Sequence, residues 1–260
     1  MKAVQTALIT GASSGIGEIF ARKLASQGFN LIITARRAER LYKLAGELED
    51  SHAVRVTVVP ADLSVMNDIH ALEGQIRNTP DLMMLVNNAG FGVHGSFVKS
   101  DPGRLQAMLD VHLSATVRLT HAALTVMKPK NEGTIINVSS VAGIIPVAGA
   151  VYSGTKSFLN IYSDLLQSEL THTNIRVQAL CPGFTYSEFH DTEDYKDWKR
   201  SEVPRFLWLK AEKVVDYSLK MLAKNRIVVI PGMAYRFMAR WNTFFRWFGR
   251  IMISGKRREA

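Results

Sequence analysis

Residues 4–17, VQTALITGASSGIG, join an apolar run to a turn that contains three glycines. We expect Val4–Thr10 to form a buried strand, Gly11–Gly17 a tight turn, and the residues through about Gln27 a helix that Gly28 ends. Glycines in such a turn let a phosphate group approach the backbone, and the helix N-terminus supplies N–H donors and a favourable dipole. The stretch therefore predicts a phosphate-binding strand–turn–helix unit at the start of a nucleotide-binding fold.

Apolar runs and amphipathic segments alternate along the rest of the chain. The expected further strands are Asn30–Ala35, Val54–Val59, Leu82–Val86, Thr134–Val138, Ile175–Leu180 and Ile227–Ile230. The expected further helices are Arg37–Asp50, Met66–Arg77, Arg104–Met127 and Ala150–Leu170. This alternation is typical of a parallel sheet with both faces covered. It predicts one doubly wound, Rossmann-like α/β domain over residues 1–232 and a C-terminal extension over 233–260.

Length and composition suit this organisation, since 260 residues, 47% of them hydrophobic, can form one domain with a large core. The single cysteine, Cys181, excludes an internal disulfide, is typical of a reducing compartment and is expected in the core. We expect no leader before the first strand and no membrane-spanning helix. These features predict a cytoplasmic protein.

The net charge of +9 is concentrated at the C-terminus, where residues 232–260 hold seven basic side chains and one acidic one. A helix over Met233–Ile253 would carry one apolar face, formed by Phe237, Trp241, Phe244, Phe245, Phe248, Ile251 and Met252. Its other face would carry Arg236, Arg240, Arg246 and Arg250. Such a helix either lies at a membrane surface or packs on its own domain or across a subunit interface. No nucleic-acid binding is expected, because bulky apolar groups separate the arginines.

Tyr152 and Lys156 are one helical turn apart, so both side chains leave the same face of a helix. A free tyrosine has a pKa of about 10 and is a poor acid–base catalyst near neutrality. A lysine ammonium beside it favours the phenolate and lowers that pKa, which lets the tyrosine exchange a proton with a carbonyl or alcohol. The spacing alone is also typical of a surface helix contact. Ser140, twelve residues earlier, and the glycine turn favour catalysis.

The chain resembles the short-chain dehydrogenase/reductase family in its single-domain form, over about residues 4–232. The resemblance rests on TGASSGIG at 10–17, Asp62-Leu63, NNAG at 87–90, INVSS at 136–140, YSGTK at 152–156 and PG at 182–183. It implies an oxidoreductase that interconverts a carbonyl and an alcohol by hydride transfer. The rival interpretation, from another class, is a catalytically silent cofactor-binding protein with a regulatory or scaffold function.

The resemblance assigns a catalytic role to four side chains. Tyr152 is the general acid or base, Lys156 lowers its pKa and binds the nicotinamide ribose, and Ser140 donates a hydrogen bond to the reacting oxygen. Ser139 is the rival for the serine role. In the family an asparagine on the long helix helps to hold a water that leads protons to the lysine, and His112 stands at that position here. A neutral histidine could also hold such a water, or be structural.

The resemblance also assigns the cofactor-binding residues. Those at the pyrophosphate and ribose are Gly11, Ser13, Ser14, Gly15, Ile16 and Gly17. Asp62 and Leu63 would flank the adenine; Asn88, Ala89 and Gly90 would follow the cofactor, and Pro182 and Gly183 would lie beside the nicotinamide, with Tyr152 and Lys156. No metal site is predicted.

The end of the Asn30–Ala35 strand predicts which cofactor is used. An acidic residue there would bind a ribose 2′-hydroxyl and repel a 2′-phosphate. The chain instead has Arg36 and Arg37, and arginine can hold a 2′-phosphate by paired, charge-assisted hydrogen bonds. We predict NADP(H), with Arg36 as the main contact and Ser13 or Arg37 assisting; the alternative for Arg37 is a solvated position at the start of the helix.

Phe184–Leu209 is a long segment without a regular pattern, where the family has a mobile substrate lid. Its apolar side chains are Phe184, Tyr186, Phe189, Phe206, Leu207 and Trp208. They predict a pocket for a hydrophobic ketone, aldehyde or acyl chain, although they could equally pack on the body of the protein. The resemblance further suggests homodimers or homotetramers that form through the two long helices.

Overall fold

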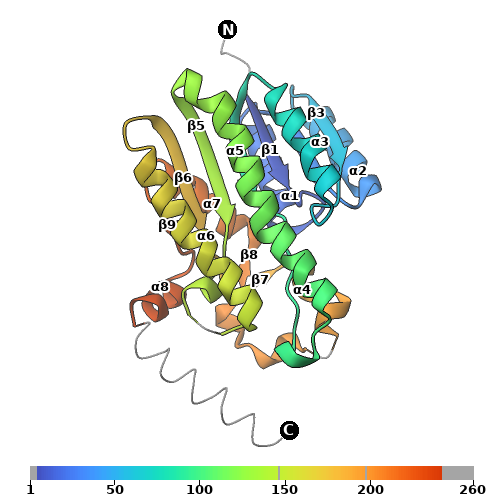
Figure 1. Ribbon diagram of the computed structural model, residues 1–260, viewed down its shortest axis with the longest axis vertical. Helices are drawn as coiled ribbons and strands as arrows, with labels where there is room; N and C mark the ends of the chain where they lie inside the picture. Colours follow the sequence, from blue (N-terminus) through green and yellow to red (C-terminus); the bar gives the residue numbers. More distant parts are fainter. Residues whose placement is uncertain (1–4, 146, 197, 242–260) are drawn as a thin grey trace, which may run out of the picture.

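The computed structural model describes residues 5–145, 147–196 and 198–241. Within these ranges seven parallel strands form one sheet in the order β3-β2-β1-β4-β5-β6-β9 (Figure 1). They are β1 (Thr6–Thr10), β2 (Asn30–Ala35), β3 (Val56–Pro60), β4 (Leu82–Asn87), β5 (Glu132–Val138), β6 (Asn174–Leu180) and β9 (Val228–Val229). A separate short pair is formed by β7 (Thr185–Tyr186) and β8 (Leu209–Lys210).

Helices cover both faces of the sheet, so the predicted doubly wound α/β fold is confirmed. The helices are α1 (Gly15–Ser26), α2 (Ala38–Ser51), α3 (Met66–Arg77), α4 (Pro102–Leu109), α5 (Thr116–Met127), α6 (Ala150–Glu169), α7 (Ala211–Leu222) and α8 (Met233–Arg240). One core lies between the sheet and α1, α2 and α7, and a second between the sheet and α3 and α5.

The central strand β1 shows how the sequence produces these two cores. All five of its residues are buried, and successive side chains of a strand point to opposite faces of the sheet. Ala7 and Ile9 therefore enter the first core, while Leu8 enters the second. A strand buried on both faces needs a continuous apolar run, which is the pattern that the sequence provides.

The order of the strands reverses between β1 and β4, which are neighbours in the sheet. The chain moves outward through β2 and β3 on one side, and through β5, β6 and β9 on the other. At such a reversal the loops that follow the two strands diverge and leave a crevice at the carboxyl edge of the sheet. The residues that follow β1 and β4 are the glycine turn and Asn88-Ala89-Gly90.

One predicted helix needs correction, and one observed helix was not predicted. The single helix predicted over 104–127 is interrupted by a π-helical segment, Asp110–Ala115, between α4 and α5. Helix α7 was not predicted, although its buried residues Ala211, Val214, Val215, Ser218 and Leu222 recur at helical spacing and could have revealed it. The lid segment 184–209 contains β7, β8 and short 3₁₀ turns, but no longer helix within its described residues.

Helix α8 is the described part of the predicted C-terminal extension. Tyr235 is 3% exposed, whereas Phe237 and Trp241 on the predicted apolar face are 61% and 56% exposed. The remaining members of that face, from Phe244 on, lie outside the described residues, so membrane contact and the division at residue 232 stay predictions. In the described ranges no helix is both long and apolar enough to cross a membrane.

Candidate active site

A cleft of about 1680 Å³ opens at the carboxyl edge of the sheet. Residues that follow six of the strands line it. Five of them come directly after their strands: Gly11, Arg36, Ala61, Asn88 and Ser139. The sixth, Pro182, is the second residue after β6. The lid and the start of α6 form its other walls. The cleft therefore lies where the topology predicts a ligand site.

The glycine turn forms one end of the cleft, and its shape excludes side chains. Gly11 and Gly15 have φ angles of +66° and +59°, in the left-handed region that favours glycine. A Cβ on Gly11 would lie 2.9 Å from the Cα of Ala89, and one on Gly17 would overlap the Gly11 carbonyl. The side-chain amide of Asn88 donates to the carbonyl oxygen of Thr10 at 2.8 Å, so Asn88 braces the turn.

The structure brings most of the predicted cofactor residues to the wall of this one cleft. They are Gly11, Ser13, Ser14, Gly15, Ile16, Arg36, Arg37, Asp62, Leu63, Asn88, Ala89, Gly90, Tyr152, Lys156, Pro182 and Gly183. Gly17 and His112 do not line it: Gly17 packs behind the turn, and His112 lies behind Gly90.

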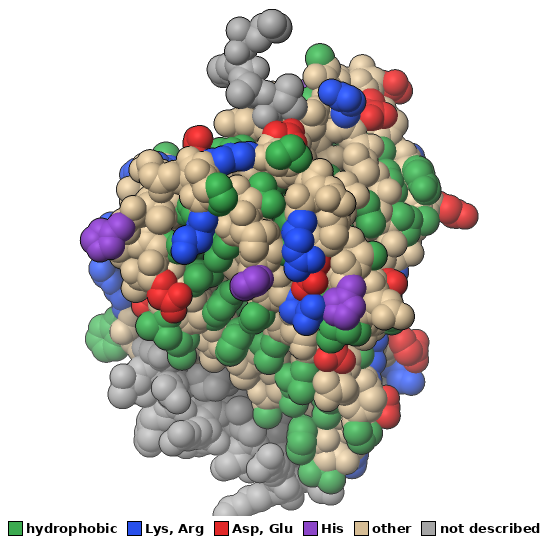
Figure 2. Space-filling model, turned by 45° about the horizontal axis from the view of Figure 1, so that its top comes forward, with side chains coloured by type: hydrophobic (Ala, Val, Ile, Leu, Met, Phe, Trp, Pro, Cys, Tyr) green, Lys and Arg blue, Asp and Glu red, His purple; other side chains and the backbone are tan. Residues whose placement is uncertain are grey.

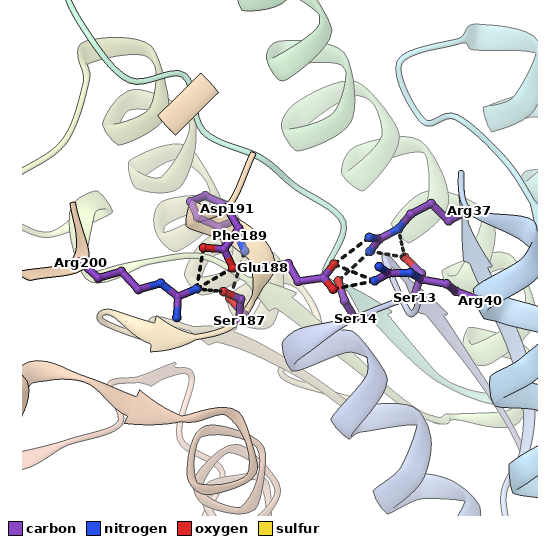
Figure 3. A network of polar contacts seen from close by, with 9 residues as sticks. All are labelled: Ser13, Ser14, Arg37, Arg40, Ser187, Glu188, Phe189, Asp191 and Arg200. Atoms are coloured by element: carbon purple, nitrogen blue, oxygen red, sulfur yellow. Dashed lines mark hydrogen bonds and ion pairs between the residues drawn. The ribbon is translucent and has the colours of Figure 1, made fainter. Parts of the chain in front are cut away.

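The two arginines after β2 differ in their contacts, and Figure 3 shows those of the second, Arg37. Arg37 donates to the hydroxyl of Ser13 at 3.0 and 3.2 Å and to that of Ser14 at 2.9 Å, and it pairs with Glu188 of the lid at 2.7 Å. Arg36 is exposed at the cleft and has no hydrogen-bond partner among the described residues. Arg37 is thus the arginine that the fold orients toward the turn, although we predicted Arg36 as the main contact.

The predicted catalytic side chains meet at the centre of the cleft. Tyr152 and Lys156 project from successive turns of α6, and Ser140, which follows β5, lies close enough to the Tyr152 hydroxyl to influence its pKa. The Lys156 ammonium donates to the carbonyl oxygen of Val138 at 2.9 Å and lies 5.7 Å from the centre of the Tyr152 ring. The Ser139 hydroxyl instead donates to the backbone oxygen of Lys156 at 2.8 Å, which favours Ser140 over Ser139.

Burial controls the titration of this pair. It raises the pKa of Tyr152 to about 12, although the hydrogen bond from Ser140 opposes the shift. It lowers the pKa of Lys156 to about 7. The sequence led us to expect a lowered Tyr152 pKa, and the structure shows the opposite direction. The reason is that desolvation of the half-buried Tyr152 outweighs the effect of the ammonium, which is bonded to the Val138 carbonyl oxygen rather than to the phenol.

His112 is buried in the π-helical segment and uses both of its ring nitrogens. Nε2 accepts a hydrogen bond from the backbone N–H of Phe91 at 3.2 Å, so Nδ1 carries the proton and donates to the Thr155 hydroxyl at 2.9 Å. Burial and then the Lys156 charge hold the His112 pKa well below its usual value. The ring is neutral and has no free nitrogen for the expected relay water; it links the segment after β4 to α6.

Tyr235 is a site residue that the sequence did not indicate. Its hydroxyl accepts from the N–H of Phe184 at 3.0 Å and donates to the carbonyl oxygen of Leu207 at 2.6 Å, so it joins the two ends of the lid. Its ring occupies the space that a Cβ on Gly183 would need. Tyr235 lies on neither face of the predicted amphipathic helix, and its partners are distant in the chain.

The lid also contacts the rest of the domain through Arg104, and one of its rings faces Tyr152. Asp194 pairs with Arg104 at 2.6 Å, and the Arg104 guanidinium stacks 3.9 Å from the centre of the Phe91 ring. The Phe189 ring lies 5.9 Å from that of Tyr152. The lid's cyclic side chains in the cleft wall are Phe184, Phe189, His190, Tyr195 and Trp198. In the described ranges no group of three or more metal-binding side chains is placed to hold an ion.

Comparison with known proteins agrees with this geometry. The sequence model of the short chain dehydrogenase family matches residues 5–197. The NADP-dependent 3-hydroxy acid dehydrogenase of Schizosaccharomyces pombe is 33% identical over 240 residues, which are 87% of this chain and 90% of that protein.

Two solved structures have the same fold over almost the whole chain. A short-chain dehydrogenase from Sphingobium yanoikuyae in complex with NADPH has a TM-score of 0.85 and 31% identity, covering 96% of this chain and 95% of that one. A bulky-bulky ketone specific alcohol dehydrogenase from Comamonas testosteroni has a TM-score of 0.80 and 30% identity, covering 96% and 94%. The chain therefore belongs to the short-chain dehydrogenase family and is an oxidoreductase of the type that acts on CH–OH and C=O groups.

Proposed function

We propose that this protein is an NADP(H)-dependent reductase of hydrophobic ketones, aldehydes or acyl-type carbonyls. The observation that carries the proposal is that Tyr152 and Ser140 line the same cleft as the glycine turn. The pair can hold a carbonyl oxygen, while the turn can hold a dinucleotide. A cofactor-binding protein without catalytic activity would need neither Ser140 nor Lys156, and both side chains line the cleft.

The wall of the cleft fits a nicotinamide dinucleotide. The turn at Gly11 and Gly15 leaves the backbone bare, and α1 begins at Gly15, so N–H groups and the helix dipole would face a pyrophosphate. The hydroxyls of Ser13 and Ser14 with the guanidinium of Arg37 would hold a 2′-phosphate, and Lys156 would bind the nicotinamide ribose. When bound, the cofactor supplies the hydride.

Tyr152 and Ser140 would then stabilise the charge that develops on the carbonyl oxygen. With a pKa raised to about 12, the Tyr152 hydroxyl remains protonated at neutral pH and can act as the proton donor. Ser140 lines the cleft with Tyr152, so a substrate oxygen placed between the two hydroxyls can accept a hydrogen bond from both. The alkoxide formed by reduction is a stronger base than a phenolate, which makes proton transfer from Tyr152 favourable.

The aromatic lid supports a bulky, apolar substrate. The approach to Tyr152 is lined by the rings of Phe189, Tyr195 and Trp198. The nearby charges of Asp194 and Arg104 are paired with each other, so neither of them is free. Apolar pockets with few polar groups bind hydrophobic ligands. The similar alcohol dehydrogenase from Comamonas testosteroni is specific for bulky-bulky ketones, which is in line with this inference.

We also infer that the protein forms homo-oligomers through the face that α5 and α6 line. On α6 the side chains of Phe158, Ile161 and Leu165 are 39%, 62% and 59% exposed. Figure 2 shows apolar side chains in a band across this part of the surface, between charged ones. Sedimentation of the wild-type protein and of Ile161→Glu tests this interface: the variant is expected to dissociate, and an unchanged mass would exclude it.

The cofactor assignment is tested by steady-state kinetics with NADPH and NADH on a panel of aromatic ketones. Arg36→Asp and Arg37→Asp are each expected to raise the KM for NADPH by roughly 10- to 100-fold, the value of one lost charge-assisted interaction. The KM for NADH should change little. Equal effects on both cofactors would contradict the assignment, and the variant with the larger effect identifies the main contact.

A further inference from the structure

The Glu188 carboxylate of the lid binds an arginine cluster, Arg37 and Arg40, beside the glycine turn (Figure 3). Glu188 contacts Arg37 at 2.7 Å and Arg40 at 2.6 and 2.8 Å, so both of its oxygens are bonded to guanidinium groups. These hydrogen bonds, from Arg40 first and then Arg37, hold the pKa of Glu188 below its usual value. The Glu188 side chain is therefore a carboxylate anion held by two guanidinium groups.

Arg37 is also the arginine that, with Ser13 and Ser14, is assigned above to a 2′-phosphate. Arg37 directs Nε and Nη2 to Ser13, Nη2 also to Ser14, and Nη1 to Glu188, so every nitrogen of the guanidinium is engaged. Nη1 carries two N–H groups and Glu188 accepts one of them, so a phosphate that binds through both must displace the carboxylate. Two anions that share one guanidinium also repel each other. Glu188 and a 2′-phosphate are thus competitors for Arg37.

The position of Glu188 also determines where the lid lies. Its neighbour Ser187 is so close to the glycine turn that a Cβ on Gly15 would come 2.9 Å from the Ser187 Cβ. Arg200 donates to the Ser187 carbonyl at 2.8 Å and to the Asp191 carboxylate at 2.7 and 2.8 Å, which holds residues 187–191 together. The pairing of Glu188 with the arginines therefore fastens this part of the lid over the turn.

We propose that Glu188 is a lid-borne substitute for the 2′-phosphate, and that a nucleotide carrying this phosphate displaces it and releases the lid from the glycine turn. The inference rests on the proposed NADP(H) function and extends it, because the 2′-phosphate then controls the position of the lid as well as cofactor choice. A nucleotide without the phosphate has no group that competes for the arginines, so it leaves Glu188 in place.

The test uses the full-length protein and two nucleotides that lack nicotinamide, 2′,5′-ADP and 5′-AMP. Calorimetric titration compares the wild type with Glu188→Gln and with Glu193→Gln, a matched lid variant whose carboxylate is exposed and pairs with Lys196. Glu188→Gln is expected to bind 2′,5′-ADP roughly three- to ten-fold more tightly, as the loss of a competing, half-exposed ion pair implies. Its affinity for 5′-AMP, and both affinities of Glu193→Gln, should equal those of the wild type.

Hydrogen exchange of the lid gives a second readout that does not depend on activity. In the wild type, 2′,5′-ADP should raise the exchange of residues 187–191 and 5′-AMP should not. Glu188→Gln and Arg40→Gln should show raised exchange there without any nucleotide. Either result supports the release step; unchanged exchange in all of these proteins overturns it.

The affinity outcomes separate this proposal from the proposed function. If the wild type binds 2′,5′-ADP and Glu188→Gln binds it equally or more weakly, Glu188 is not a competitor and the proposal is overturned, while the cofactor assignment stands. If neither protein binds 2′,5′-ADP more tightly than 5′-AMP, the 2′-phosphate assignment fails, and the role of Glu188 fails with it.

Discussion

Replacing Lys156 by methionine should stabilise the protein at neutral and mildly acidic pH, although it removes a proposed catalytic group. Lys156 is 4% exposed, and burial lowers its pKa from 10.5 to about 7. The folded protein therefore binds this proton more weakly than the unfolded chain does. The cost of burying the charged form is fully present below pH 7, and it is lost progressively as the pH rises toward the ordinary lysine pKa.

The size of the effect follows from the shift in pKa. Below pH 7 the cost of burying the charged amine is at most about 5 kcal/mol, since each pKa unit corresponds to about 1.4 kcal/mol. Methionine removes that cost, but it leaves the Val138 carbonyl without its hydrogen bond, which costs about 1–3 kcal/mol. Lys156→Met should thus be more stable than the wild type by roughly 2–4 kcal/mol at pH 6.

The pH dependence is the sharper part of this prediction. Between pH 6 and pH 8 the folded amine loses most of its proton while the unfolded amine keeps it, so the wild type should gain about 1.4 kcal/mol relative to the variant. Tyr152 and Cys181, whose pKa values burial raises to about 12, keep their protons throughout this window.

Urea unfolding without nucleotide at pH 6, 7 and 8 measures the difference between the two proteins. Lys213→Met, on the exposed side of α7, controls for the loss of one positive charge. The stability advantage of Lys156→Met should shrink as the pH rises, while the difference for Lys213→Met stays constant. A constant difference for Lys156→Met as well would refute the lowered pKa of the buried amine.

Two further predictions concern His112 and Tyr235, which link separate segments around the cleft. His112→Leu should lose about 1–3 kcal/mol of unfolding free energy, because the Phe91 N–H loses its acceptor. It should also lose most of its activity, because the ring no longer links the segment after β4 to α6, which carries Tyr152 and Lys156. His112→Asn should retain activity, and a fully active leucine variant would exclude this positioning role. Tyr235→Phe should raise hydrogen exchange at Phe184 and raise the ketone KM more than it lowers kcat; unchanged exchange would exclude Tyr235 as the link between the lid ends.

The fold could be predicted because its signals are local. The apolar run that became β1 is followed at once by the glycine turn, and both depend only on residues that adjoin each other in the chain. The predicted strands reappear in the sheet with ends shifted by a few residues. The motifs that line the cleft could likewise be located, because each follows a strand and parallel strands end at the same edge.

The features that were not predicted depend on contacts between distant residues. The π-helical segment accompanies the His112 bond to Phe91, which no local pattern reveals. The pairing of Glu188 with Arg37 joins residues 151 positions apart. The direction of the Tyr152 pKa shift also could not be read from the Y-x-x-x-K spacing, because it depends on how deeply the fold buries the hydroxyl.

In the proposed reaction Tyr152 gives a proton to a carbonyl oxygen, and the cofactor supplies the hydride. The direct measurement follows the loss of NADPH absorbance with a panel of bulky aromatic ketones, for the wild type and for Tyr152→Phe. We expect turnover by the wild type and a kcat that is roughly 10²–10⁴-fold lower in the variant, with unchanged NADPH binding. A phenylalanine variant that reduces the same ketone at the wild-type rate would contradict it.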